Sequence, residues 1–183
     1  MKKQVILALV LALFINAVDA QDRYFTRGAK VVFVSETELE KIVGTNSQGT
    51  NVYDTKTGQF EFAVLMKSFV FEKALLEEHF NENYAESSKY PKSTFKGMVE
   101  DPSKVNLTKD GVYPVKIKGQ LTMHGVTKDV ATEGVFEVKG GKIIGKSNFI
   151  VTLADYKIEI PSLVKDKISK DVKISVLSDY KKM

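Results

Sequence analysis

The sequence feature that most constrains the fold is an alternation of apolar and polar residues with a period of two. Successive side chains of a β-strand point to opposite faces, so each such stretch predicts a strand with one buried and one wet face. The alternation is clearest in residues 60–66, 113–123, 149–153 and 172–176.

Glycine-containing turn signals separate these stretches. Gly, and Asp before Gly, tolerate the positive φ that tight hairpin turns require. Strands joined by short turns predict an antiparallel sheet that forms a sandwich or closes into a barrel, whereas a doubly wound α/β fold needs long crossovers. The turn signals are Thr57-Gly58, Asp110-Gly111, His124-Gly125 and Gly140-Gly141.

One segment, residues 71–84, has the composition of a helix instead. Leu76, Phe80 and Tyr84 recur every four residues and form an apolar stripe. At about 100° per residue, His79 and Asn83 fall on the same side as this stripe. A second short helix is expected near residues 163–169.

The first twenty residues predict a cleavable secretory signal peptide. Lys2 and Lys3 precede eleven consecutive apolar residues, 5–15, and the segment ends at Ala20, after which we place the cut. A membrane-spanning helix needs about 20 apolar residues, so an anchor is the weaker interpretation. Residues 21–183 are then one exported domain. With no cysteine in the chain, no disulfide can stabilise this domain, which favours the bacterial periplasm over animal secretion.

The overall positive charge does not predict nucleic-acid binding. The isoelectric point is near 9.0, but the lysines alternate with Glu and Asp and form no basic block. We therefore expect a mixed-charge surface with no nucleic-acid partner. Transient contact with a membrane surface stays open, and the sequence predicts no oligomeric state.

The inventory of catalytic side chains is small, so we do not expect an enzyme. The chain has two histidines, His79 and His124, and no cysteine. No nucleophile elbow, phosphate-binding glycine loop or metal-ligand spacing is present in the sequence. His79 is either a polar latch at a cavity mouth or a partly buried structural histidine. His124 precedes Gly125 in a turn, which favours a structural role.

Aromatic residues gather in one third of the predicted domain. In a sandwich they would fill the core, and in a barrel of about eight strands they would line an interior that holds one small ligand. Composition leaves both alternatives open. The clustered phenylalanines are Phe60, Phe62, Phe69, Phe71, Phe80 and Phe95.

Three motifs in order resemble those of the YceI-like family over roughly residues 24–180. Residues 79–84 with 89–97 (HFNENY and KYPKSTFKG) resemble its helix-and-strand motif. Residues 119–128 (GQLTMHGVTK) resemble its second motif, and residues 155–158 (DYKI) its acidic-aromatic turn. In the family this turn often continues with Gly, where Lys157 stands here.

The resemblance implies a fold and a ligand. The fold is all-β with one helical insertion: a lipocalin-like, eight-stranded antiparallel β-barrel. The ligand is a polyisoprenoid or isoprenoid quinone held in the barrel of a non-catalytic periplasmic protein, with no other cofactor. The alternative is a structural or protein-interaction module of the same fold with a filled interior. We expect wall contacts from Phe60, Phe62, Phe95, Phe136 and Phe149, and a mouth near His79, Asn83 and Tyr84.

Overall fold

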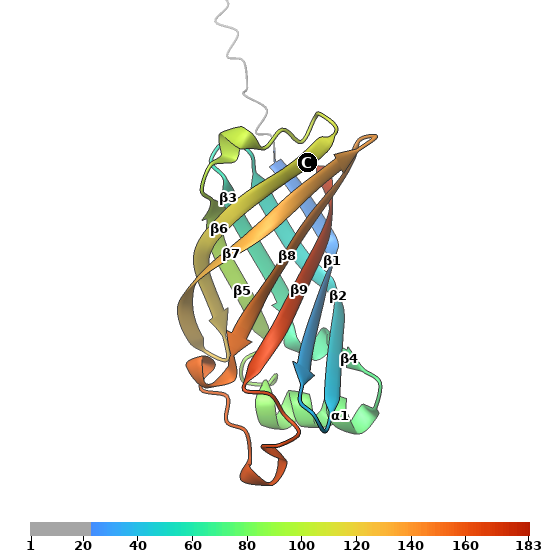
Figure 1. Cartoon of the computed structure of the whole chain (residues 1–183), viewed down its shortest axis with the longest axis vertical. Helices are drawn as coiled ribbons and strands as arrows, with labels where there is room; N and C mark the ends of the chain where they lie inside the picture. Colours follow the sequence, from blue (N-terminus) through green and yellow to red (C-terminus); the bar gives the residue numbers. More distant parts are fainter. Residues whose placement is uncertain (1–22) are drawn as a thin grey trace, which may run out of the picture.

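The computed structural model describes residues 23–183, which form a closed antiparallel β-barrel (Figure 1). Eight strands follow one another around the barrel in the order β1-β9-β8-β7-β6-β5-β3-β2, and β2 pairs with β1 to close it. The predicted eight-stranded antiparallel barrel with a helical insertion is therefore confirmed. The predicted signal peptide and its cut after Ala20 lie outside the described residues.

Long strands and short connections make up most of the described chain. Of its helices, none is long and apolar enough to cross a membrane. The strands are β1 (Arg23–Glu36), β2 (Lys41–Asp54), β3 (Gln59–Leu65), β4 (Val70–Phe71), β5 (Lys92–Val99), β6 (Gly111–Met123), β7 (Val126–Lys139), β8 (Lys142–Thr152) and β9 (Asp171–Lys182). The helical segments are α1 (Ala74–His79), the π-helical turn Phe80–Tyr84, and the 3-10 turns Met66–Ser68, Pro102–Lys104, Leu153–Tyr156 and Ser162–Val164.

The period-two pattern corresponds to the inner and outer faces of the barrel. On β6, Val115, Ile117 and Leu121 are buried, while Lys116 and Lys118 between them are exposed. The apolar side chains are thus shielded from water inside the barrel, and the lysines keep their charges in solvent outside it.

The helical insertion lies where one strand of the barrel is interrupted. β3 pairs with β2 as far as Ala63 and with β5 as far as Leu65, which lies opposite Lys92. After a 3-10 turn, β4 resumes the pairing with β2 at Thr45 and Gly44. Residues 72–91 then leave the sheet, and α1 crosses this end of the barrel (Figure 1).

The predicted helix is present and ends in a wider π turn. The amide of Ala85 donates to the carbonyl of Phe80 at 2.8 Å, an i→i+5 hydrogen bond. The second predicted helix, 163–169, is wrong. Residues 162–164 form a single 3-10 turn, and Leu163 is 95% exposed, so no apolar face is buried to stabilise a longer helix.

The two ends of the barrel differ. At one end, residues 100–110 fold over the opening and bury Val105 and Leu107. Both described ends of the chain lie here, where the amide of Met183 donates to the carbonyl of Arg23 at 2.8 Å. The opposite end carries the β1–β2 hairpin, α1 and the β8–β9 connection (Figure 1). We call these the closed end and the open end.

Candidate functional site

An apolar cavity of about 310 Å³ occupies the interior of the barrel toward the open end. Side chains from all nine strands, the helical insertion and the β8–β9 connection line it. Its volume falls at the lower end of the range for small-molecule pockets, which are mostly apolar with few polar groups. The interior is filled by the protein's own side chains only at the closed end.

Four of the five phenylalanines expected on the wall line this cavity: Phe60, Phe62, Phe95 and Phe149. Their contact with a ligand stays a prediction. Phe136 does not line the cavity. Its ring stacks on Tyr53 with centroids 5.0 Å apart and packs against Tyr180 at 5.7 Å, within the core of the closed end.

Two glycines determine where the ring of Phe95 lies. Gly97 and Gly119 are directly opposite each other on β5 and β6. A Cβ at Gly97 would lie 2.7 Å from that ring and 2.3 Å from the backbone oxygen of Lys118. A Cβ at Gly119 would lie 2.8 Å from the same ring and 2.3 Å from the backbone oxygen of Lys96. Since real Cβ atoms do not approach this closely, only glycine lets the ring pack across the backbone here.

An aromatic cluster lies where the helical insertion meets the barrel. The ring of Phe80 lies 5.3 Å from Phe33, 5.5 Å from Phe69 and 5.1 Å from Phe71, measured between centroids. All four rings line the cavity. Because Phe80 comes from the insertion and the others from β1, β4 and the segment before β4, this aromatic cluster docks the insertion onto the barrel.

The mouth of the cavity is identified by which lining residues are exposed. Among the lining residues in the described chain, only His79 and Lys167 are exposed, and Glu40 is half-buried. Of the residues expected at the mouth, His79 and Tyr84 line the cavity, whereas Asn83 is exposed and does not. The π turn changes the rotation per residue, so Asn83 leaves the face shared by Leu76 and Phe80.

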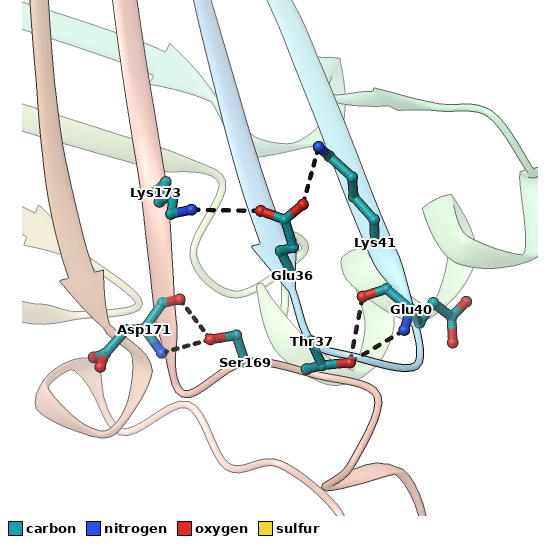
Figure 2. A network of polar contacts seen from close by, with 7 residues as sticks. All are labelled: Glu36, Thr37, Glu40, Lys41, Ser169, Asp171 and Lys173. Atoms are coloured by element: carbon teal, nitrogen blue, oxygen red, sulfur yellow. Dashed lines mark hydrogen bonds and ion pairs between the residues drawn. The ribbon is translucent and has the colours of Figure 1, made fainter.

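Hydrogen bonds and ion pairs hold the rim of the mouth (Figure 2). In the β1–β2 hairpin, Thr37 Oγ1 accepts from the amide of Glu40 at 3.1 Å. Glu36 lies between Lys41 at 3.1 Å and Lys173 at 3.4 Å, which ties β1 to both neighbouring strands. The lowered pKa of Glu36 follows from its hydrogen bonds with these two lysines.

The β8–β9 connection is tied to the same rim at its end. The amide of Ser169 donates to Ser35 Oγ on β1 at 2.9 Å. Ser169 Oγ donates to the carbonyl of Asp171 at 2.7 Å (Figure 2). The start of β9 is therefore fixed against β1 next to the mouth.

His124, which also lines the cavity, joins three segments of the chain. Its Nδ1 lies 3.0 Å from the carbonyl oxygen of Tyr156 and its Nε2 lies 2.7 Å from Glu86 Oε2. Tyr90 packs against the imidazole with centroids 4.5 Å apart. A carbonyl oxygen and a carboxylate oxygen both accept hydrogen bonds, so both ring nitrogens of His124 lie against acceptors. These contacts fit the structural role expected for His124. Its backbone is left-handed, with a φ of 51°.

A buried polar cluster lies at the closed end. Asn51 Nδ2 donates to the hydroxyl of Tyr180 at 2.6 Å and to Ser178 Oγ at 3.3 Å. Burial raises the pKa of Tyr53 to about 12, with a smaller contribution from the carboxylate of Asp54. Burial also raises the pKa of Tyr180 far above its usual value. Both hydroxyls therefore stay neutral, as an apolar interior requires.

The cavity has the chemistry of a binding site for an apolar molecule. Within residues 23–183, no group of three or more His, Asp or Glu side chains is placed to hold a metal ion. Of the two histidines, His124 is engaged with Glu86 and Tyr156, and His79 lies at the rim in solvent.

Comparisons with known proteins agree with this architecture. Residues 25–178 match the model of the YceI-like domain. A polyisoprenoid binding domain from Saccharophagus degradans, implicated in plant cell wall breakdown, has a TM-score of 0.77 at 17% identity, covering 87% of this chain and 98% of its own.

Two further solved structures share the fold. Burkholderia cenocepacia BcnA has a TM-score of 0.68 at 13% identity, covering 84% of this chain and 96% of its own. The Campylobacter jejuni YCEI protein has a TM-score of 0.57 at 18% identity, covering 76% and 84%. No curated protein sequence matches the chain.

Proposed function

The chain belongs to the YceI-like domain family, and on this premise we propose that it is a non-catalytic carrier of a long apolar isoprenoid-type lipid. The lipid is a polyisoprenoid or an isoprenoid quinone held inside the barrel. The observation that carries the proposal is the apolar cavity of about 310 Å³, which is blocked at the closed end and meets solvent between His79 and Lys167.

The physical chemistry of the cavity suits such a ligand. Each CH₂ group that moves from water into an apolar site contributes about 0.8 kcal/mol, so a chain of about 15 carbons would gain on the order of 12 kcal/mol. Association costs about 4–15 kcal/mol, which leaves room for useful affinity with few polar contacts. A closed barrel also leaves no unpaired strand edge facing the lipid.

The rim supplies polar contacts for the ligand's head group. Glu40, His79 and Lys167 all line the cavity near solvent. A lipid whose tail lies among Phe60, Phe95 and their neighbours would leave its polar end at this rim, where water and these side chains solvate it. The polyisoprenoid-binding description of the Saccharophagus degradans domain supports this class of ligand.

Export of the carrier is part of the proposal. The positive and apolar segment that ends at Ala20 and the absence of cysteine support a periplasmic or secreted protein. Expression of the full chain in a bacterium, followed by fractionation and intact-mass measurement, tests this. The expected product begins at Gln21 in the exported fraction, and an uncleaved cytoplasmic product would contradict it.

Lipid extraction tests the carrier function. Residues 21–183 are purified, extracted with organic solvent and measured by mass spectrometry, and uptake of an added quinone or polyprenyl lipid is measured in parallel. Val130→Phe fills part of the cavity wall, while Val112→Phe adds the same group on the outer face of β6.

The carrier proposal expects lipid in the unmodified protein and in Val112→Phe, and less in Val130→Phe. The absence of both co-purified lipid and uptake would overturn it. Equal lipid content in the two variants would show that the ligand lies outside the cavity.

A further inference from the structure

Three exposed leucines lie at the tips of three separate segments of the open end. Leu39 in the β1–β2 hairpin is 70% exposed, Leu75 in α1 is 60% exposed, and Leu163 in the β8–β9 connection is 95% exposed. Single exposed leucines are ordinary on protein surfaces. Three of them on independent segments around one opening are typical of a surface that binds a partner.

The three leucines surround the cavity mouth. Glu40 follows Leu39, His79 lies one helical turn after Leu75, and Val164 follows Leu163. Glu40, His79 and Val164 all line the cavity. Figure 1 shows the hairpin, α1 and the β8–β9 connection together at this end of the barrel. The apolar tips are therefore continuous with the opening through which a ligand enters.

The rim does not let two of these tips fold back. Thr37 Oγ1 accepts from the amides of Leu39 and Glu40 at 3.3 and 3.1 Å, which fixes the hairpin. Phe80, one residue after α1, is docked among three other rings. The exposure of Leu39 and Leu75 is thus a property of the folded scaffold.

Charge on the three segments identifies the kind of partner. A strongly acidic or basic partner would need an excess of the opposite charge at the tips. Residues 37–40, 73–79 and 160–170 instead carry nearly balanced charge, with four lysines and five carboxylates: Lys73, Lys165, Lys167, Lys170, Glu38, Glu40, Glu77, Glu78 and Asp166. Apolar tips with balanced charge fit the interface of a zwitterionic bilayer.

We propose that the open end docks on a lipid bilayer by inserting Leu39, Leu75 and Leu163, so that the cavity mouth faces the membrane. This inference rests on the proposed function, because a carrier of membrane lipids must exchange its ligand with a bilayer. Since the leucines supply the contact, binding to phosphatidylcholine vesicles requires no anionic lipid and depends little on salt.

Vesicle co-sedimentation with matched variants tests the docking. The test variant is Leu39→Ser, Leu75→Ser and Leu163→Ser together. The control variant is Val52→Ser, Val112→Ser and Met183→Ser, which removes apolar groups that are 38%, 67% and 69% exposed away from the open end. Residues 21–183 and both variants are mixed with phosphatidylcholine vesicles in about 50 mM and about 500 mM salt, because salt screens any electrostatic contribution to binding.

The expected result is an apparent partition coefficient that falls at least about tenfold in the test variant and stays within about twofold in the control variant. Uptake of a lipid delivered from solution is measured on the same three proteins. This uptake is expected to be equal in all three proteins, which separates docking from ligand binding. Loss of uptake in every protein would overturn the carrier proposal but not the docking proposal.

Three outcomes would overturn the docking proposal. The first is equal partition of the test variant and the unmodified protein. The second is binding that requires anionic lipid and disappears in high salt. The third is no vesicle binding combined with a dimer, seen by light scattering, that the test variant dissociates, because the tips would then contact a second copy of the chain.

Discussion

Replacing Phe80 with alanine is expected to detach the helical insertion from the barrel. Phe80 is the one ring of the aromatic cluster that the insertion contributes, and it touches Phe33, Phe69 and Phe71 at centroid distances of 5.1–5.5 Å. The other apolar anchors of the insertion are Leu76 and Tyr84, which are only half-buried, and the small buried side chain of Ala85. The substitution therefore removes the largest apolar contact between the insertion and the sheet.

The size of the effect follows from these contacts. Burying a whole Phe side chain contributes about 1.5–3 kcal/mol, and Phe80 is half-buried, so the transfer contribution is about 1 kcal/mol. Each aromatic pair adds about 0.5–1.5 kcal/mol, and the three pairs share one ring. We expect Phe80→Ala to lower the free energy of unfolding by about 2–4 kcal/mol, below the largest values known for Phe→Ala in a core. Phe80→Leu, which keeps the apolar volume, should lose about half of this.

Urea unfolding monitored by near-ultraviolet circular dichroism measures this loss. Phe25→Ala is the matched control, because Phe25 is also half-buried but lies under the guanidinium of Arg27, 5.8 Å from its ring, outside the cluster. The control should lose about 1 kcal/mol. A loss below about 1 kcal/mol for Phe80→Ala, or equal losses for both variants, would refute the docking role of the cluster.

Three further predictions concern stability. Burial raises the pKa of Tyr53 to about 12 and that of Tyr180 still further, whereas the unfolded chain titrates near 10. The unfolded state therefore loses these protons first, and stability falls as the pH rises from about 10 to 12, by up to about 1.4 kcal/mol per pH unit for each tyrosine. Urea midpoints across this range should fall less steeply in Tyr180→Phe, and equal slopes would contradict the assignment. Lys157 has a left-handed φ of 56°, so Lys157→Gly should raise the stability by about 0.5–1 kcal/mol, the strain relieved less the extra entropy of unfolded glycine; a lower thermal midpoint would disprove this. His124→Ala should cost about 1–3 kcal/mol in urea unfolding because both hydrogen bonds of a largely buried ring are lost, while His79→Ala should change stability by less than about 0.5 kcal/mol; similar losses would count against the role of His124.

Much of the barrel could be predicted because one strand carries its own pattern. The alternation of Val115, Ile117 and Leu121 with lysines assigns the inner face of β6 without knowledge of any other strand. The helical insertion was predictable for the same reason, since its apolar stripe is local. Phe136 shows the limit: periodicity gives the face of a strand but not the level along the barrel axis, so the sequence could not tell the closed end from the cavity.

The residues that the sequence did not reveal depend on contacts between distant segments. Lys167 reaches the mouth because the amide of Ser169 is bonded to Ser35, 134 residues earlier. Glu86 and His124 are 38 residues apart and meet only once the insertion is docked. No local pattern encodes such pairs, although the left-handed turn at His124 was foreseeable from Gly125 after it.

The meeting of Arg23 and Met183 at the closed end has a practical consequence. Both described termini lie at the far end of the barrel from α1 and the mouth (Figure 1). A fluorescent protein, an affinity tag or a sensor surface joined to the C-terminus would therefore stand about a barrel's length away from the opening. Immobilisation by this end orients every molecule with its cavity toward the solution, so the protein can serve as a surface-bound receptor for apolar molecules without redesign of its scaffold.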